Sequence, residues 1–321
     1  MSSPQLGSES AQKSILVDPS GRRVKSLRLS VTQRCDLACF HCHREGQRPV
    51  STEMTPAEIE RLVSVSASLG ISKVKITGGE PLIRKDIAEI VRRISPLLKE
   101  VSLTTNGTRL GELAENLKDA GLARVNVSLH TLDPQRYERL CGSGDLERVT
   151  RGIESAVAAG LNPVKVNMVV FRNENECEIA DLMEFCAERK AVLQLIEYEG
   201  DRVDCCNEEF ARRYYPLTEI ESSLARSAIS ISVNELHRRR RFLVPANGSR
   251  VEVEVVRPMH NTEFCSHCTR LRLTSNGTLK PCLLELGGEV DVLSPMREGA
   301  SDDALVDLFR QAVKNRTPYW R

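Results

Sequence analysis

The 321-residue sequence has no run of about eighteen apolar residues, the length that a transmembrane helix needs, so we expect no membrane span. Residues 1–13 are rich in Ser and Gln and lack the apolar core of a signal peptide, and we expect a flexible tail there. Neither charge is in large excess: the net charge is +1, which gives no indication of binding to nucleic acid or to a membrane.

Cysteine is distributed unevenly along the chain. Six of the 11 cysteines form two triplets, which are Cys35, Cys39 and Cys42, spaced CxxxCxxC, and Cys265, Cys268 and Cys282, which begin with CxxC. This grouping is typical of metal ligands in a reducing compartment rather than of a disulfide framework, so we expect a cytoplasmic protein.

Each triplet can hold three irons of a four-iron cluster and leave the fourth iron open to a ligand, so we expect two 4Fe–4S clusters. Zinc is the alternative metal for both triplets. The first triplet would then be a zinc knuckle, and His260 or His267 would complete a Cys–His site with the second.

Strand-like and helix-like segments alternate from residue 25 to about residue 198. The strand-like segments are 27–31, 73–77, 101–105, 124–129, 164–171 and 192–197, and the helix-like segments are 56–69, 86–98, 110–120, 146–159 and 176–189. Repeated strand–helix units build parallel sheets with right-handed crossovers. The pattern predicts an α/β fold with a partial (β/α)6 barrel similar to a TIM barrel; an open doubly wound sheet is the alternative.

The predicted strands carry polar residues on one face and apolar residues on the other, whereas parallel strands normally read as apolar runs. If the apolar faces pack against helices, the residues that point inward are Arg28, Lys73, Lys75, Asn126, Ser128, Lys165 and Asn167. Several inward cations predict an open lumen that holds an anionic ligand, because unpaired buried charges are too costly. The alternative is an antiparallel sheet with one solvated face.

The pattern changes after residue 198. We expect antiparallel strands at 229–233, 241–244 and 250–256, a hairpin of 270–274 and 278–282, and a helix at 302–314. The basic run 237–241 is interpreted as a solvated strand or turn. The expected domains are the barrel at 14–225 and a smaller antiparallel-strand domain at 226–321, which carries the second triplet.

Two motifs together resemble the radical S-adenosylmethionine (radical SAM) superfamily: CxxxCxxC after the first strand and Gly78-Gly79-Glu80-Pro81 after the second. In that superfamily the open iron binds SAM, which is cleaved to a 5′-deoxyadenosyl radical. The two glycines let the backbone approach a ligand closely, and Glu80 can receive an ammonium group.

Four stretches, 27–35, 104–107, 126–129 and 264–274, resemble the GTP 3′,8-cyclase family of molybdenum cofactor biosynthesis, and the run around Cys39 is similar to archaeal members. The resemblance implies that the first triplet holds the SAM cluster and that the second holds a cluster whose open iron binds guanine. It assigns SAM contacts to His41, Gly78, Gly79, Glu80 and Ser128, and GTP contacts to Arg28, Lys73, Lys75, Thr104, Lys165, Arg270 and Arg272. Arg270 and Arg272 are also the expected catalytic residues.

The implied reaction converts GTP to (8S)-3′,8-cyclo-7,8-dihydroguanosine 5′-triphosphate: hydrogen leaves ribose C3′, and the carbon radical attacks guanine C8. The implied partners are an electron donor and a downstream cyclic pyranopterin monophosphate synthase, and a homodimer is open to the chain. The alternatives are a radical SAM peptide-modifying maturase with an auxiliary cluster and a non-catalytic nucleotide sensor with a zinc-stabilised C-terminal domain.

The chain departs from the family pattern in two places. Gln194 stands where the family often has Arg, so we expect one phosphate or cofactor contact to be weakened or replaced, with Arg202 as the nearby candidate. Many members end in a Gly-Gly tail that reaches the active site. This chain ends Pro318-Tyr319-Trp320-Arg321, so we expect that role to be absent or met differently. Cys205 and Cys206 are interpreted as having no catalytic role.

Overall fold

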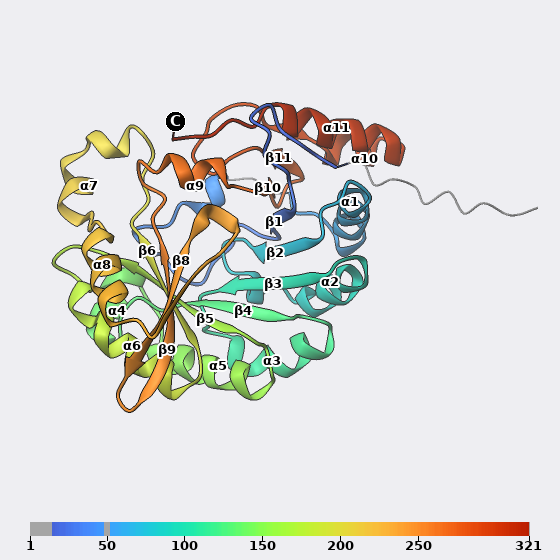
Figure 1. The fold of residues 1–321 in the computed structure, drawn as a ribbon. Coiled ribbons are helices and arrows are strands. Elements are labelled where there is room, and N and C mark those ends of the chain that lie inside the picture. The colour runs from blue at the N-terminus through green and yellow to red at the C-terminus, as the bar shows by residue number, and fades with distance from the viewer. Residues whose placement is uncertain (1–14, 48–51, 321) are drawn as a thin grey trace, which may run out of the picture.

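Six parallel strands in chain order form the centre of the computed structural model, which describes residues 15–47 and 52–320 (Figure 1). The strands are β1 (Ser26–Ser30), β2 (Lys73–Thr77), β3 (Glu100–Thr105), β4 (Arg124–Ser128), β5 (Val164–Val170) and β6 (Val192–Glu197). The helices around the outside of this curved sheet are α1 (Pro56–Ser68), α2 (Ile87–Ile94), α3 (Leu110–Asp119), α4 (Pro134–Cys141), α5 (Leu146–Ala158) and α6 (Ile179–Glu188). The predicted alternation is confirmed. The tail predicted for residues 1–13 lies outside the described residues.

Local capping signals explain where the helices begin. The Thr55 hydroxyl accepts the Glu58 N–H at 3.3 Å, the Glu58 carboxylate accepts the Thr55 N–H at 2.8 Å, and Pro56 occupies the first turn of α1. Asp133 followed by Pro134 begins α4 in the same way. This short helix was not predicted, although its start signal is present in the sequence.

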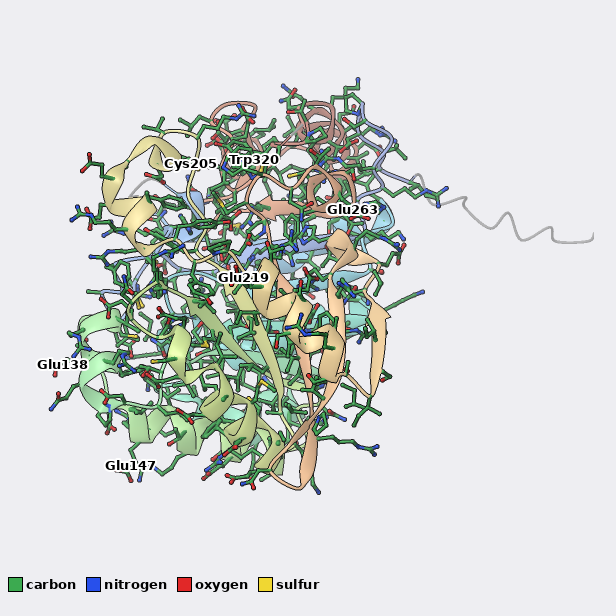
Figure 2. The ribbon with its side chains drawn as sticks, turned by 60° about the vertical axis from the view of Figure 1, so that its left-hand side comes forward. Glu138, Glu147, Cys205, Glu219, Glu263 and Trp320 are labelled. Carbon is green, nitrogen blue, oxygen red and sulfur yellow. The ribbon has the colours of Figure 1, made fainter. Side chains whose placement is uncertain are left out.

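The two faces of the strands differ as the polar–apolar alternation predicts. In β2, Val74 and Ile76 are fully buried in the core, whereas Lys75 lines a cavity. The outer helices turn charged residues to the periphery, as Glu138 and Glu147 show in Figure 2. Lys73 does not follow the prediction, because its side chain is 56% exposed and lies 3.8 Å from a carboxylate oxygen of Glu100, outside the cavity lining.

The C-terminal region continues the same sheet. Its elements are α7 (Glu208–Arg213), α8 (Thr218–Ser227), β7 (Ser230–Val233), β8 (Arg240–Ala246), β9 (Ser249–Val256), α9 (Thr262–Ser266), β10 (Arg270–Leu273), β11 (Thr278–Lys280), β12 (Val290–Asp291), α10 (Leu293–Arg297) and α11 (Asp302–Lys314). The strand order is β12-β11-β10-β1-β2-β3-β4-β5-β6-β9-β8-β7.

The purely antiparallel arrangement predicted for these strands is therefore wrong. β9 pairs in parallel with β6, and β10 pairs in parallel with β1, while each is antiparallel to its other neighbour. Alternation within a strand indicates which face is buried, but pairing direction depends on partners that are distant in sequence. Within the described residues, no helix combines the length and apolar character that crossing a membrane requires.

Candidate active site

One cavity of about 600 Å³ runs along the polar face of the parallel strands. Its lining includes every residue that the sequence assigns to a cluster, SAM or GTP, apart from Lys73. The C-terminal region contributes to the same lining, from Asn234 to Trp320. The structure thus brings both cysteine triplets and the predicted cations of β1, β2 and β5 to one cavity.

The first triplet lies on the loop after β1. Cys35 and Cys42 are exposed, Cys39 is half-buried, and all three are free thiols. The backbone N–H of Leu37 lies 3.4 Å from Cys35 Sγ, and that of Arg44 lies 3.4 Å from Cys42 Sγ. Iron–sulfur sites use such hydrogen bonds to tune the cluster. Three thiols supported by N–H groups therefore fit a four-iron cluster.

The triplets fit by donor type rather than as finished coordination shells. Within residues 15–47 and 52–320, no three His, Cys, Asp or Glu side chains converge in a metal-binding geometry. The thiol of Cys39 hydrogen-bonds to that of Cys141, which raises the pKa of Cys39. Cys39 must therefore leave Cys141 in order to bind a metal.

Hydrogen bonds from the ends of β2 and β3 hold this loop. Asp36 accepts Asn106 Nδ2 at 2.7 Å and the Thr108 hydroxyl at 2.8 Å. Glu80 is buried and accepts the N–H of Asn106 at 2.6 Å and the hydroxyl of Thr105 at 2.8 Å. Burial raises the pKa of Glu80 to about 7. Asp36 and Glu80 thus link the cysteine loop to the two strand ends beside it.

Gly78 and Gly79 are required by the cysteine loop itself. A Cβ on Gly79 would lie 2.1 Å from the carbonyl oxygen of Arg34, and a Cβ on Gly78 would lie 2.5 Å from that of Thr32. The Gly79 N–H also donates to Thr32 O at 2.7 Å. The close approach predicted for these glycines is therefore, in this structure, an approach to residues 32–34.

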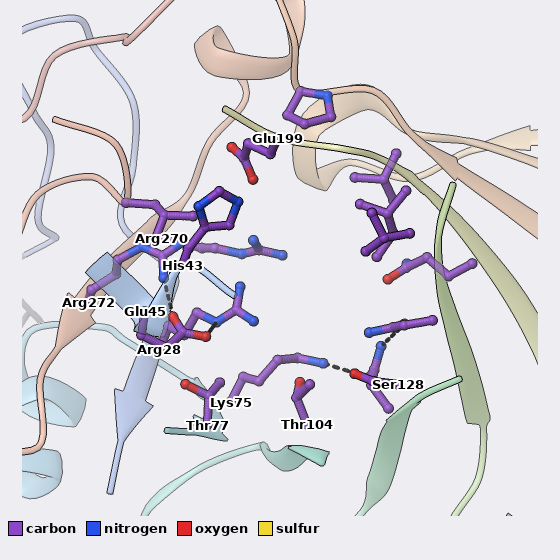
Figure 3. A pocket seen from close by; sticks show the side chains of 18 of the residues that line it. Arg28, His43, Glu45, Lys75, Thr77, Thr104, Ser128, Glu199, Arg270 and Arg272 are labelled. Carbon is purple, nitrogen blue, oxygen red and sulfur yellow. Dashed lines mark hydrogen bonds and ion pairs between the residues drawn. The ribbon is translucent and has the colours of Figure 1, made fainter. Parts of the chain in front are cut away.

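His41 packs its ring in an aromatic cluster beneath the loop. Its centroid lies 4.7 Å from that of His130 and 5.2 Å from that of Phe171. Burial lowers the pKa of His130 to about 4, and Nδ1 of His130 accepts the N–H of Val169. Ser128 ends β4 on the same cavity wall (Figure 3). Both histidines are therefore neutral, apolar-facing parts of the wall near neutral pH.

Cations gather on the side of the cavity formed by β1, β2 and β10 (Figure 3). Lys75 Nζ donates to Asn126 at 2.6 Å, and neither Lys75 nor Arg270 has a carboxylate partner among the described residues. Burial, with repulsion from Arg124, Arg28 and nearby cations, holds the pKa of Lys75 well below its ordinary value. An anion bound here would relieve that repulsion.

Glu45 places a carboxylate among these cations. It lies 3.1 Å from Nε of Arg28 and 2.5 Å from Nη1 of Arg272 (Figure 3). Burial alone would raise the pKa of Glu45, but Arg28 and Arg272 lower it below its ordinary value. The carboxylate thus occupies two guanidinium groups that the resemblance assigns to GTP.

The second triplet surrounds α9 and the end of β11. Cys265, Cys268 and Cys282 are half-buried free thiols on the cavity wall. Trp320 N–H lies 3.4 Å from Cys265 Sγ, and Arg316 donates to the Cys268 carbonyl at 2.9 Å. Their donor type fits a cluster as at the first triplet.

The histidines considered for a zinc site lie elsewhere. Nδ1 of His267 is 2.9 Å from the carbonyl oxygen of Glu263, and the ring of His260 packs 4.3 Å from the indole of Trp320. Neither histidine belongs to the cavity lining.

The sequence analysis missed two buried charges, Arg239 and Glu254. Glu254 is fully buried on β9, and the Arg239 side chain is only 10% exposed and lines the cavity. The interpretation of run 237–241 as a solvated strand or turn is therefore wrong at Arg239 and at His237, which is buried. Alternation in β9, with Val253 and Val255 on the other face, was the available signal.

Two departures from the family pattern can be placed. Arg202 lies against Tyr319, with its guanidinium 4.3 Å from the ring centroid, outside the cavity lining. Tyr319 and Trp320 themselves line the cavity. Cys205 belongs to the turn Asp204–Cys206 and lies outside the lining.

Comparison with known proteins agrees with this site. A family described as the Radical SAM superfamily matches residues 29–186, and one described as Molybdenum Cofactor Synthesis C matches residues 191–321. Fold and site together define a radical SAM protein, a class that implies a 4Fe–4S cluster and SAM. The crystal structure of Streptococcus suis SuiB bound to S-adenosylmethionine shares the fold, with a TM-score of 0.63, 15% identity, and coverage of 93% of this chain and 77% of that one.

Relatives with closer sequences identify the family. The probable GTP 3′,8-cyclase of Pyrococcus abyssi is 52% identical over 306 residues, which cover 95% of this chain and 100% of that protein. That of Thermococcus kodakarensis is 51% identical over 308 residues, covering 96% and 100%. The chain belongs to the GTP 3′,8-cyclase family, and the predicted resemblance and its archaeal type are confirmed.

Proposed function

We propose that this protein cyclises GTP to (8S)-3′,8-cyclo-7,8-dihydroguanosine 5′-triphosphate in molybdenum cofactor biosynthesis. The observation that carries the proposal is the single cavity that joins two cysteine triplets to a set of buried cations. A nucleotide there can direct its phosphates to the cations and its base and ribose to the cysteine loops.

The proposal includes the finer architecture. A partial (β/α)6 barrel spans residues 14–225, and a domain at 226–321 holds a second 4Fe–4S cluster on Cys265, Cys268 and Cys282. The first cluster is held by Cys35, Cys39 and Cys42. Support comes from the order of β1 to β6, from the free thiols and from the two family matches.

SAM, reduced at the first cluster, supplies the radical that takes hydrogen from ribose C3′, and one electron and one proton quench the ring after C8 attack. The protein positions the reactants and excludes water. His41, Gly78, Gly79, Glu80 and Ser128 line the SAM side. Arg28, Lys75, Thr104 and Lys165 hold GTP together with the catalytic pair Arg270 and Arg272, and Lys73 acts from the rim.

The partners follow from this chemistry. An electron donor must reduce the first cluster, and the product passes to cyclic pyranopterin monophosphate synthase. A homodimer is the proposed assembly, and the cytoplasm is the proposed location because the thiols must stay reduced.

An anaerobic assay tests the function. The protein reconstituted with iron and sulfide receives SAM and dithionite, with GTP, with ATP or with no nucleotide. Mass spectrometry should detect 5′-deoxyadenosine and a cyclised guanine nucleotide only with GTP, and Arg270→Ala and Cys282→Ala should lose the second product. Deoxyadenosine without a GTP-derived product would refute the cyclase and favour the maturase alternative.

A further inference from the structure

A carboxylate outside the family motifs organises one wall of the cavity. Glu254 on β9 lies opposite Gln194 on β6 in the strand register and is fully buried. Its Oε2 accepts Gln194 Nε2 at 2.9 Å and pairs with Lys165 Nζ. Its Oε1 lies 2.9 Å from Arg239 Nη2. One carboxylate therefore holds two cations from different elements side by side.

The charges in this group do not cancel. Burial alone would raise the pKa of Glu254, but Arg239 and Lys165 lower it below its ordinary value, so it is an anion. Two cations share this single negative charge. Since Lys75 and Arg124 line the same cavity, the group adds to a surplus of positive charge. Such a surplus in a low-dielectric cavity attracts an anionic ligand.

Arg239 also has an unused donor. Its Nε is buried and has no hydrogen-bond partner among the described residues. A buried charged donor without a partner is costly, so an acceptor from a ligand is expected in the cavity. Backbone turns at His237 and Arg238, with φ of 62° and 52°, bring the chain to this position.

The depth of the group indicates which part of a nucleotide it meets. Lys165 is the second residue of β5 and Arg124 the first of β4, near the amino ends of the strands. The first cysteine loop and Gly78 follow the carboxyl ends of β1 and β2. A nucleotide whose reacting atoms lie near the cysteines therefore extends its phosphates toward Lys165 and Arg239.

We propose that Arg239 is a phosphate-binding residue of the nucleotide site and that Glu254 is a positioning residue, which holds Arg239 and Lys165 as a pair for one phosphate group. The identity of the nucleotide as GTP rests on the proposed function. The guanidinium supplies the planar fork that phosphate oxygens accept, and Lys165 adds a point charge beside it.

Anaerobic equilibrium dialysis of the reconstituted holoenzyme tests this with GTP, guanosine and inorganic tripolyphosphate. Arg239→Ala should weaken GTP and tripolyphosphate binding by about 10- to 100-fold and leave guanosine binding unchanged. Arg239→Lys, which keeps the charge and the Glu254 pair, should lose less. Arg240→Ala is the matched control, because Arg240 is 42% exposed and lies outside the cavity lining.

Glu254→Gln tests the positioning role. In that background Arg239→Ala should cost much less affinity than in the wild type, because the guanidinium is no longer held, whereas a merely structural role would leave the two effects additive. Normal GTP and tripolyphosphate binding by folded Arg239→Ala and Arg239→Lys, or an equal loss of guanosine binding, would overturn the inference. If wild type forms no cyclised product but Arg239→Ala still loses tripolyphosphate binding, only the proposed function fails.

Discussion

Asp36 on the first cysteine loop accepts a hydrogen bond from Asn106 Nδ2 at 2.7 Å, at the end of β3. Its second oxygen accepts the hydroxyl of Thr108 at 2.8 Å. Because Asp36 directly follows Cys35, these bonds fix where the first ligand leaves the strand. The loop is thus positioned by β3 as well as by its own strand, β1.

Thr108→Val keeps the shape of the side chain and removes one of these bonds. We expect about 1 kcal/mol less unfolding free energy and a lower iron content at the first triplet, because the loop is held less firmly. Iron should be measured with Cys265, Cys268 and Cys282 replaced by Ala, so that only the first triplet binds it. Thr150→Val on α5 is the control, and equal iron in both variants would contradict the prediction.

Glu45→Gln should strengthen GTP binding on the order of fivefold, or about 1 kcal/mol, because the carboxylate competes with phosphate for Arg28 and Arg272. Calorimetric titration of the reconstituted protein measures this effect, which should shrink at high salt. Glu235→Gln, at an exposed ion pair with Lys25, should change nothing. Weaker binding in Glu45→Gln would show that Glu45 supports the two arginines rather than competing.

The parallel strands and their polar face were predictable because both are local properties. The bounds of β2 and β6 agree with the prediction, since alternation and flanking turns lie within each segment. The pairing of β9 and β10 was not predictable, because it depends on β6 and β1, which are distant in sequence.

The site shows the same division. The cysteine triplets and the inward cations were identified from spacing and alternation, and they line one cavity. Arg239 was missed because a basic run looks solvated until its partner is known. That partner, Glu254, becomes a neighbour only through the β8–β9 and β6–β9 pairing. Lys73 was misplaced because alternation gives the face of a strand and not the depth of a residue along it.

Leu273→Ala should destabilise the whole protein rather than the C-terminal region alone. Leu273 is fully buried on β10 and lies opposite Leu29 of β1 in the register. We expect a loss of about 2–5 kcal/mol, because the substitution leaves a cavity at this contact. Circular dichroism, which reports mainly on the outer helices, and fluorescence of Trp320 should shift together in thermal unfolding. A shift of the fluorescence transition alone would instead indicate that 226–321 unfolds independently.

Glu80 should give the protein a distinctive pH dependence. Burial raises its pKa to about 7 in the folded state, from an ordinary value of 4.5 in the unfolded chain. Between these two values the folded protein keeps a proton that the unfolded chain has released. Its contribution to stability is therefore fully present below pH 4.5 and is lost as the pH rises toward 7.

Glu80→Gln removes this titration, and the comparison isolates it from other carboxylates. The unfolding free energy of wild type relative to Glu80→Gln should fall by about 1–3 kcal/mol between pH 4.5 and 7, since each unit of pKa shift corresponds to about 1.4 kcal/mol. Urea unfolding at a series of pH values measures the difference. A difference that stays constant or rises over this range would mean that the hydrogen bonds from Leu82, Thr105 and Asn106 keep Glu80 ionised despite its burial.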